Sequence, residues 1–111
     1  MLSLNEYQTE AKDTRVYKEC GQGTIGAVAY CALGLAGEAG EVANKVKKLI
    51  RDGDTPDMRA KILDEIGDTL WYCAMLTDEL GADLSSVAQY NLGKLATRRA
   101  QNKIGGSGDN R

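Results

Sequence analysis

Four carboxylates in two closely spaced pairs are the side chains of this sequence best suited to chemistry. Glu38 and Glu41 form the first pair, Glu65 and Asp68 form the second, and each pair is spaced i, i+3 within a segment that reads as a helix. Residues three apart lie on one helix face, so each segment presents two carboxylates together. Converging carboxylates repel one another unless cations lie between them, and hard divalent ions prefer oxygen ligands. The pattern therefore favours a divalent metal site.

Both pairs border the apolar face of their predicted helix. At about 100° per residue, Glu38 borders the apolar arc of the earlier helix and Glu41 lies just outside it. Glu65 and Asp68 border the later arc on the same side, with Tyr72 between them. Antiparallel packing would bring all four acids together beside the core. A single such pair is usually only a solvated face, but two pairs at matched angles are harder to explain in that way.

A group of amide and basic side chains could bind anions. Asn91, Lys94 and Arg98 share one face of a predicted helix, and Lys45 and Lys48 follow the first acidic pair. The first three are either an exposed stripe near a helix C-terminus, which the helix dipole favours, or a phosphate clamp that donates hydrogen bonds to anionic oxygens. Metal-binding acids beside such cations suit a polyphosphate substrate.

Composition excludes several other chemistries. The chain has 111 residues, a net charge of −2, three cysteines and no histidine. Catalytic Ser-His and Cys-His pairs are therefore excluded within one chain, and Cys/His zinc sites and Glu-x-x-His di-iron sites are not expected. The charge gives no indication of nucleic-acid binding, and we find neither a signal peptide nor an uninterrupted apolar stretch of membrane-spanning length. We expect a cytoplasmic protein with no nucleic-acid or membrane partner.

The hydrophobic periodicity predicts an all-α fold, a helical bundle of about four main helices without a sheet. Capping residues and glycines place these helices at about residues 3–18, 24–51, 55–80 and 83–104. We expect residues 1–104 to form one domain. The glycine-rich residues 105–111 are predicted to be a disordered tail.

Two apolar side chains of the third predicted helix, Trp71 and Met75, lie outside its apolar arc. They could pack within the monomer core or, with less support, Trp71 could stack on a base. Our preferred interpretation is a subunit interface. A chain of this size has limited capacity to cover two faces of a long helix, so we expect the bundle to be completed by oligomerisation.

Three segments together resemble a known family. The run YCALGLAGEAGEVANKVKKLIRDGD, followed by LDEIGDTLWY and NLGKLATRR, resembles the MazG-like all-α nucleoside triphosphate pyrophosphohydrolases. The family pattern is ExxE, a variable spacer and ExxD, followed by NxxK and an arginine. The resemblance covers roughly residues 4–104, and the short form looks most like phage-type and other compact members.

The resemblance implies a metal-dependent hydrolase that uses Mg²⁺, with Mn²⁺ as the alternative. Such an enzyme cleaves (deoxy)nucleoside triphosphates between the α- and β-phosphates, releasing nucleoside monophosphate and pyrophosphate. The resemblance also implies a homodimer or dimer of dimers, in bacterial or phage-infected host cytoplasm. A non-catalytic helical module that binds nucleotides or proteins is the alternative, but the intact acids together with NxxK favour the enzyme. Base and sugar preference and the biological role stay open.

The resemblance carries over residue by residue. It implies that the metal ligands are an acidic quartet, namely Glu38, Glu41, Glu65 and Asp68. Gly37 stands where some members have a further Glu, so Glu38 and Glu41 are both candidates for the general base. The implied substrate contacts are Lys45, Lys48, Tyr72, Asn91, Lys94 and Arg98.

Overall fold

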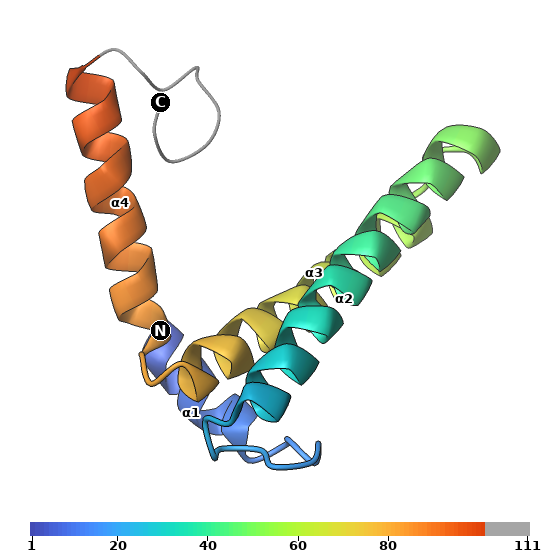
Figure 1. Ribbon diagram of the computed structural model, residues 1–111. Coiled ribbons are helices and arrows are strands. Elements are labelled where there is room, and N and C mark those ends of the chain that lie inside the picture. The colour runs from blue at the N-terminus through green and yellow to red at the C-terminus, as the bar shows by residue number, and fades with distance from the viewer. Residues whose placement is uncertain (102–111) are drawn as a thin grey trace.

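The computed structural model describes residues 1–101, and all regular structure within them is helical (Figure 1). The predicted all-α fold is confirmed, with four helices in this part of the chain. Both the expected end of the last helix near residue 104 and the expected tail at 105–111 lie outside the described residues. The helices are α1 (Leu4–Lys12), α2 (Ile25–Asp52), α3 (Pro56–Glu79) and α4 (Leu84–Ala100).

Each helix begins at a residue whose side chain satisfies a backbone N–H group. Ser3, Thr24, Thr55 and Asp83 are the N-caps, and each accepts a hydrogen bond from the N–H three residues further on. Helix starts leave such N–H groups without a partner inside the helix, which is why short polar side chains favour these positions. The predicted starts of the helices are therefore confirmed to within a residue or two.

The first helix is shorter than predicted, because it ends at Lys12 and not near residue 18. Residues 13–24 form an irregular segment, called here the connecting loop. The hydroxyl of Thr14 donates to the carbonyl of Ala11 at 2.7 Å, which is the kind of local side-chain bond that competes with helix continuation. Glu19 then has a φ of 63°, which lies in the left-handed region and ends any helical path.

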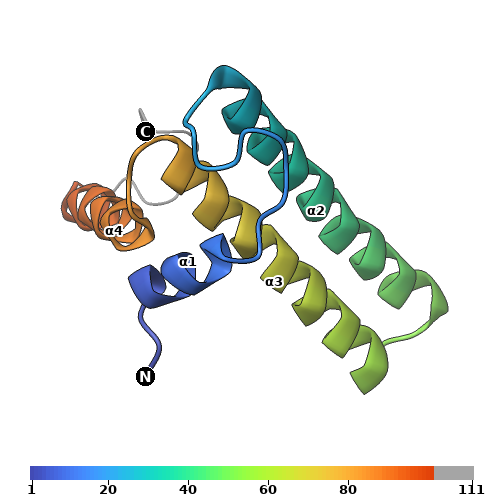
Figure 2. The ribbon, with the colours of Figure 1, turned by 90° about the horizontal axis from the view of Figure 1, so that it is seen from below.

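The long helices α2 and α3 form an antiparallel hairpin that dominates the molecule (Figures 1 and 2). The turn contains Gly53, whose φ of 122° is far more accessible to glycine than to other residues. The short helix α1 and the helix α4 both contact α3, whereas α4 makes no contact with α2. In Figure 1, α4 and the hairpin diverge from the end of the molecule where α1 lies.

The hairpin and α4 together have the shape of a V (Figure 1). The core lies at its closed end, where α1 and the connecting loop meet α3. Met75 is fully buried there, so the prediction that Met75 lies at a subunit interface is wrong. Helix α1 packs against α3 on this second face, a contact that the hydrophobic periodicity of α3 alone could not show. The buried apolar residues of the described chain are Ala11, Tyr17, Ala27, Cys31, Ala74, Met75 and Leu84.

Trp71 also packs within the chain, against the expectation that it faces a partner. Its ring is half-buried and lies edge-on to Tyr17 and Tyr72, with centroids 6.3 and 5.0 Å away. Its indole nitrogen donates to the hydroxyl of Thr14 at 2.9 Å. These contacts account for its position outside the apolar arc, so Trp71 gives no support to an interface.

Helix α2 is long and apolar enough, by length and composition alone, to cross a membrane. This is weak evidence of a membrane span, because a packing helix of a soluble bundle meets the same criteria. Glu38 and Glu41 lie near the middle of α2, where two charges would be costly in a bilayer. The expected absence of a membrane partner stays a prediction.

A buried carboxylate fastens the connecting loop to the end of α3. Glu79 accepts hydrogen bonds from the hydroxyl of Tyr17 and from the backbone N–H groups of Gly21 and Gly23, at 2.7 and 2.9 Å for the two glycines. Burial by itself raises the pKa of Glu79, but these three hydrogen bonds and the charge of Arg15 outweigh burial and hold the pKa below its ordinary value. The ionised form therefore stabilises the loop.

Replacing Glu79 with Gln should lower the free energy of unfolding by about 3 kcal/mol at neutral pH. The amide keeps only one acceptor oxygen and turns an NH₂ group towards hydrogen-bond donors. Urea unfolding measures the loss, and Glu10→Gln, at an exposed position of α1, is the control.

The same variant has a predicted pH dependence. Because the folded pKa of Glu79 is lowered, its contribution to stability is present above its unfolded pKa, near 4.5, and is lost as pH falls through the folded value. The stability difference between wild type and Glu79→Gln should therefore shrink in acid. A difference that stays constant across this range would contradict the role of the ionised carboxylate.

Candidate metal centre and adjoining pocket

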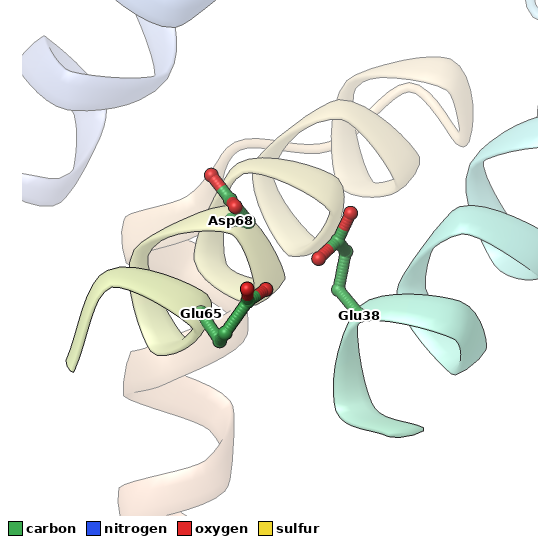
Figure 3. Close-up of side chains that lie close together, drawn as sticks. All are labelled: Glu38, Glu65 and Asp68. Atoms are coloured by element: carbon green, nitrogen blue, oxygen red, sulfur yellow. The ribbon is translucent and has the colours of Figure 1, made fainter. Parts of the chain in front are cut away.

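Three of the four predicted acids come together across the hairpin. Glu38 extends from α2 towards Glu65 and Asp68 on α3, as Figure 3 shows. One carboxylate oxygen from each lies within 4.8 Å of the other two, and these residues are called here the three-acid cluster. Two oxygens on opposite sides of Mg²⁺ are separated by about 4.2 Å, twice the usual metal–oxygen distance. The cluster therefore needs only a small closure to hold one such ion.

The electrostatics of the cluster also favour a cation. The pKa of Glu38 is raised, first by burial and then by its hydrogen bond with Glu65 and the negative charges of Asp68, Glu65 and Glu41. Like charges disfavour the ionised form, and a positive ion between them would reverse that effect. The raised pKa thus reflects both the burial of Glu38 and its convergence with other acids.

Glu41, the fourth predicted ligand, lies outside the three-acid cluster. Its side chain is exposed and pairs with Lys45 one turn along α2, at 3.7 Å. The same ammonium lies 3.5 Å from Glu65, so Lys45 bridges Glu41 to the cluster. Lys48 is half-buried and lies almost one turn further along α2. Lys45 therefore contacts the three-acid cluster directly, whereas Glu41 lies at the edge of this cluster.

A pocket of about 350 Å³ opens beside the cluster. Glu38 and Asp68 line one part of it, and Thr14, Trp71 and Tyr72 line the rest. Its volume falls within the range of small-molecule sites. The pocket combines carboxylates with an aromatic wall, and it includes Tyr72 as a predicted substrate contact.

Gly34 allows Tyr72 to reach this position. A Cβ atom at Gly34 would lie 2.2 Å from the ring of Tyr72, far closer than any real contact. The glycine therefore lets the ring lie directly against α2. By contrast, a Cβ at Gly37, Gly40 or Gly67 would meet nothing within 4 Å in the described chain. These three positions leave open space beside the acids.

The predicted phosphate clamp lies on α4, which contacts α3 but diverges from the hairpin in Figure 1. Asn91 is exposed, Lys94 is half-buried with its ammonium 5.6 Å from the centroid of the Tyr90 ring, and Arg98 is buried. Because α4 makes no contact with α2 and diverges from both α2 and α3 in Figure 1, one chain does not bring this group to the three-acid cluster. The clamp and the three-acid cluster are separate within the described chain.

Thr14 and Glu79 are the residues of this region that the sequence reasoning missed. Thr14 falls in the segment predicted to continue the first helix, so no role could be assigned to it. The pair Asp13-Thr14 was the available signal, because both side chains favour helix ends and turns. Glu79 carries no local signal, since its partners lie more than fifty residues earlier in the sequence.

The fold and site together define a class: all-α proteins in which two antiparallel helices present carboxylates beside a pocket. A family model of the MazG nucleotide pyrophosphohydrolase domain matches residues 29–102, and the chain belongs to this family. It is 47% identical over 114 residues to the Gene 37 protein of Mycobacterium phage L5, an alignment that covers 99% of this chain and 100% of that protein. The name of this relative indicates no activity. No solved structure is significantly similar to the chain.

The family match begins after the N-terminal part of the chain. It includes the acidic quartet, the lysines of α2 and the predicted clamp on α4. Helix α1 and the connecting loop precede it, although Thr14 of that loop lines the pocket. The family assignment therefore gives no role to the part of the pocket that this loop forms.

Proposed function

We propose that this protein hydrolyses (deoxy)nucleoside triphosphates between the α- and β-phosphates in an Mg²⁺-dependent reaction. The products are a nucleoside monophosphate and pyrophosphate. The observation that carries the proposal is the three-acid cluster beside a pocket of about 350 Å³, in a chain of the MazG nucleotide pyrophosphohydrolase family. The nature of the donors and the family support the same chemistry.

The residues present fit Mg²⁺, with Mn²⁺ as the alternative. Glu38, Glu65 and Asp68 offer only carboxylate oxygens, which are the hard ligands that these ions prefer, and Glu41 is the proposed fourth ligand. A bound ion would lower the pKa of a water molecule and polarise the phosphorus that this water attacks. Glu38 and Glu41 are the candidates to accept the proton from that water.

The cations of the chain are proposed to bind the phosphates. Lys45 already lies at the acids, and Lys48 follows it on α2. Positive charge at these positions would stabilise the leaving pyrophosphate. Tyr72 is proposed to approach the sugar, which its place in the wall of the pocket supports.

A second copy of the chain is proposed to complete the site, in a homodimer or dimer of dimers. Asn91, Lys94 and Arg98 belong to the proposed substrate contacts, yet α4 diverges from the hairpin within one chain. Large apolar side chains stay exposed along the outer part of the hairpin, and open space remains beside the acids. Both features are typical of a surface that packs against a partner. The exposed apolar residues of this part are Val46, Ile50, Leu63, Ile66 and Leu70.

Residues 1–104 are proposed to act as one domain in the cytoplasm, with nucleoside triphosphates as the ligand and no nucleic-acid or membrane partner. Contacts between distant segments support a single unit. The side chain of Gln8 in α1 donates to the carbonyl of Ala74 at 3.1 Å and accepts from the N–H of Leu84 at 2.9 Å. This buried amide joins three helices of the described chain.

Mg²⁺ should raise the melting temperature of the wild-type protein. An ion that binds only the folded state at one hundred times its dissociation constant stabilises that state by about 2.7 kcal/mol. Differential scanning fluorimetry at constant ionic strength measures the shift. In Asp68→Asn the shift should be much smaller, and without Mg²⁺ this variant should be at least as stable as wild type, because one repelling charge is gone. An equal shift in both proteins would exclude the cluster as the binding site.

The substrate is tested by incubating the purified protein with each nucleoside triphosphate and deoxynucleoside triphosphate and Mg²⁺. We expect equal amounts of monophosphate and pyrophosphate from at least one of them. Nucleotide binding without turnover would instead support a non-catalytic module. The screen also gives the preferred base and sugar.

A further inference from the structure

We infer that Thr14 is a positioning residue of the pocket, which orients the indole of Trp71 as the wall that receives the nucleoside part of the substrate. The inference rests on the proposed function. It concerns the connecting loop, which precedes the residues matched by the family model. Thr14 and Trp71 both line the pocket that also contains Glu38 and Asp68.

The hydrogen bonds of Thr14 have only one possible direction. Its hydroxyl proton is donated to the carbonyl of Ala11 at 2.7 Å, so its oxygen accepts from the indole N–H of Trp71 at 2.9 Å. A hydroxyl has one proton, which is therefore already committed to the backbone. The ring also makes edge-on contacts with Tyr17 and Tyr72, which restrict its movement further. The indole thus has one favoured orientation.

The connecting loop holds Thr14 in place because its next residues are bound to the end of α3. Arg15 pairs with Asp78 at 2.6 Å, and Tyr17 donates to the buried carboxylate of Glu79. The ring of Tyr17 also stacks on Tyr30, with centroids 4.9 Å apart. Thr14 is therefore fixed between the end of α1 and a well-anchored part of the loop.

The chemistry of the pocket divides as a nucleotide does. Glu38 and Asp68 belong to the end that would hold the metal and hence the phosphates, so the nucleoside would extend towards Trp71 and Tyr72. Bases stack on aromatic side chains, and this contact depends on ring orientation. The second lone pair of Thr14 adds an acceptor but no donor. The wall therefore suits a nucleoside whose flat base stacks on the indole and which offers an N–H or O–H group to the oxygen of Thr14.

The test uses Trp71 as its own reporter, since it is the only tryptophan of the chain. Thr14→Val removes the hydroxyl but keeps the side-chain shape, whereas Thr14→Ser keeps the hydroxyl. Thr9→Val is the matched control, because it makes the same change at an exposed position of α1. Each variant is measured by tryptophan emission, acrylamide quenching and steady-state kinetics with the preferred triphosphate and Mg²⁺.

We expect Thr14→Val to shift the emission, increase quenching and raise KM about five-fold, the usual effect of losing one neutral hydrogen bond. Its kcat should stay within about two-fold of wild type, because the indole that Thr14 orients contacts the nucleoside and not the reacting phosphate. Thr14→Ser and Thr9→Val should behave as wild type. Binding is followed separately from turnover by adding the triphosphate with Ca²⁺ in place of Mg²⁺. This addition should change the tryptophan emission of wild type more than that of Thr14→Val.

Unchanged emission and KM in Thr14→Val would overturn the inference, as would an equal loss in Thr14→Ser. A fall in kcat alone would also overturn it, because that result assigns Thr14 to the chemical step. If wild type hydrolyses no triphosphate, the proposed function fails, while the emission of the variants still tests whether Thr14 orients Trp71. Normal turnover without any emission change on binding would place the nucleoside elsewhere.

Discussion

Replacing Asp68 with Asn should lower turnover by at least about 100-fold, while the protein keeps its helical fold. The substitution preserves the size of the side chain but removes one negative charge from the three-acid cluster. The affinity of the cluster for the metal ion should therefore fall, and turnover with it. Glu38→Gln should have a similar effect, because Glu38 reaches the same point from the other helix. Steady-state rates with Mg²⁺ and circular dichroism of each variant measure the two parts of this prediction.

The control is Asp64→Asn, which makes the same chemical change on α3 next to Glu65. Asp64 is exposed and does not belong to the cluster, so its variant should keep near-wild-type turnover. Glu41→Gln should also lower turnover by about 100-fold, as a proposed ligand and candidate base. Full activity in Glu41→Gln together with an inactive Asp68→Asn would leave Glu38 as the candidate base. Near-wild-type activity in both Asp68→Asn and Glu38→Gln would remove the cluster from the mechanism.

Leu63→Glu should dissociate the assembly and abolish most activity in the same variant. Leu63 is two-thirds exposed on α3, beside an apolar pocket that Val46, Leu49 and Ile62 also line. A charge at this position cannot be desolvated against a partner without a large cost. Light scattering at micromolar concentration should give wild type at least twice the chain mass of 11.9 kDa, and the variant a single chain.

Lys61→Glu is the matched control for this prediction. It introduces the same side chain on α3 about 200° around the helix from Leu63, at an exposed position where it removes one surface ion pair, with Asp57 at 3.3 Å, that contributes little to stability. It should change neither mass nor activity. A wild-type protein that is fully active as a monomer would refute the proposed assembly, and an active monomeric Leu63→Glu would show that one chain contains the whole site.

Local sequence patterns predicted the hairpin and most of the acidic cluster. The i, i+3 spacing and the apolar arcs determine which face Glu38, Glu65 and Asp68 occupy, and a short turn makes the two helices antiparallel. Four N-caps were likewise predictable, because a cap depends on residues within one helical turn. These features require only local information and one packing step.

Contacts between distant segments account for what the sequence could not predict. Met75 belongs to a core cluster that includes Ala11 and Tyr17, far from it in sequence, and Glu79 receives bonds from a loop some sixty residues earlier. A helical wheel shows only that Trp71 lies outside the apolar arc, and not that Thr14 supplies its partner. The direction of α4 also depends on its contacts with α1 and α3, which periodicity does not determine.

Hydrolysis in water enriched in ¹⁸O is the most direct test of cleavage between the α- and β-phosphates. We expect equal amounts of nucleoside monophosphate and pyrophosphate, with the label in the monophosphate because water attacks the α-phosphorus. Formation of both products should require Mg²⁺ and should fail in Asp68→Asn. Release of nucleoside diphosphate and inorganic phosphate, or the absence of turnover with every triphosphate, would contradict the proposed function.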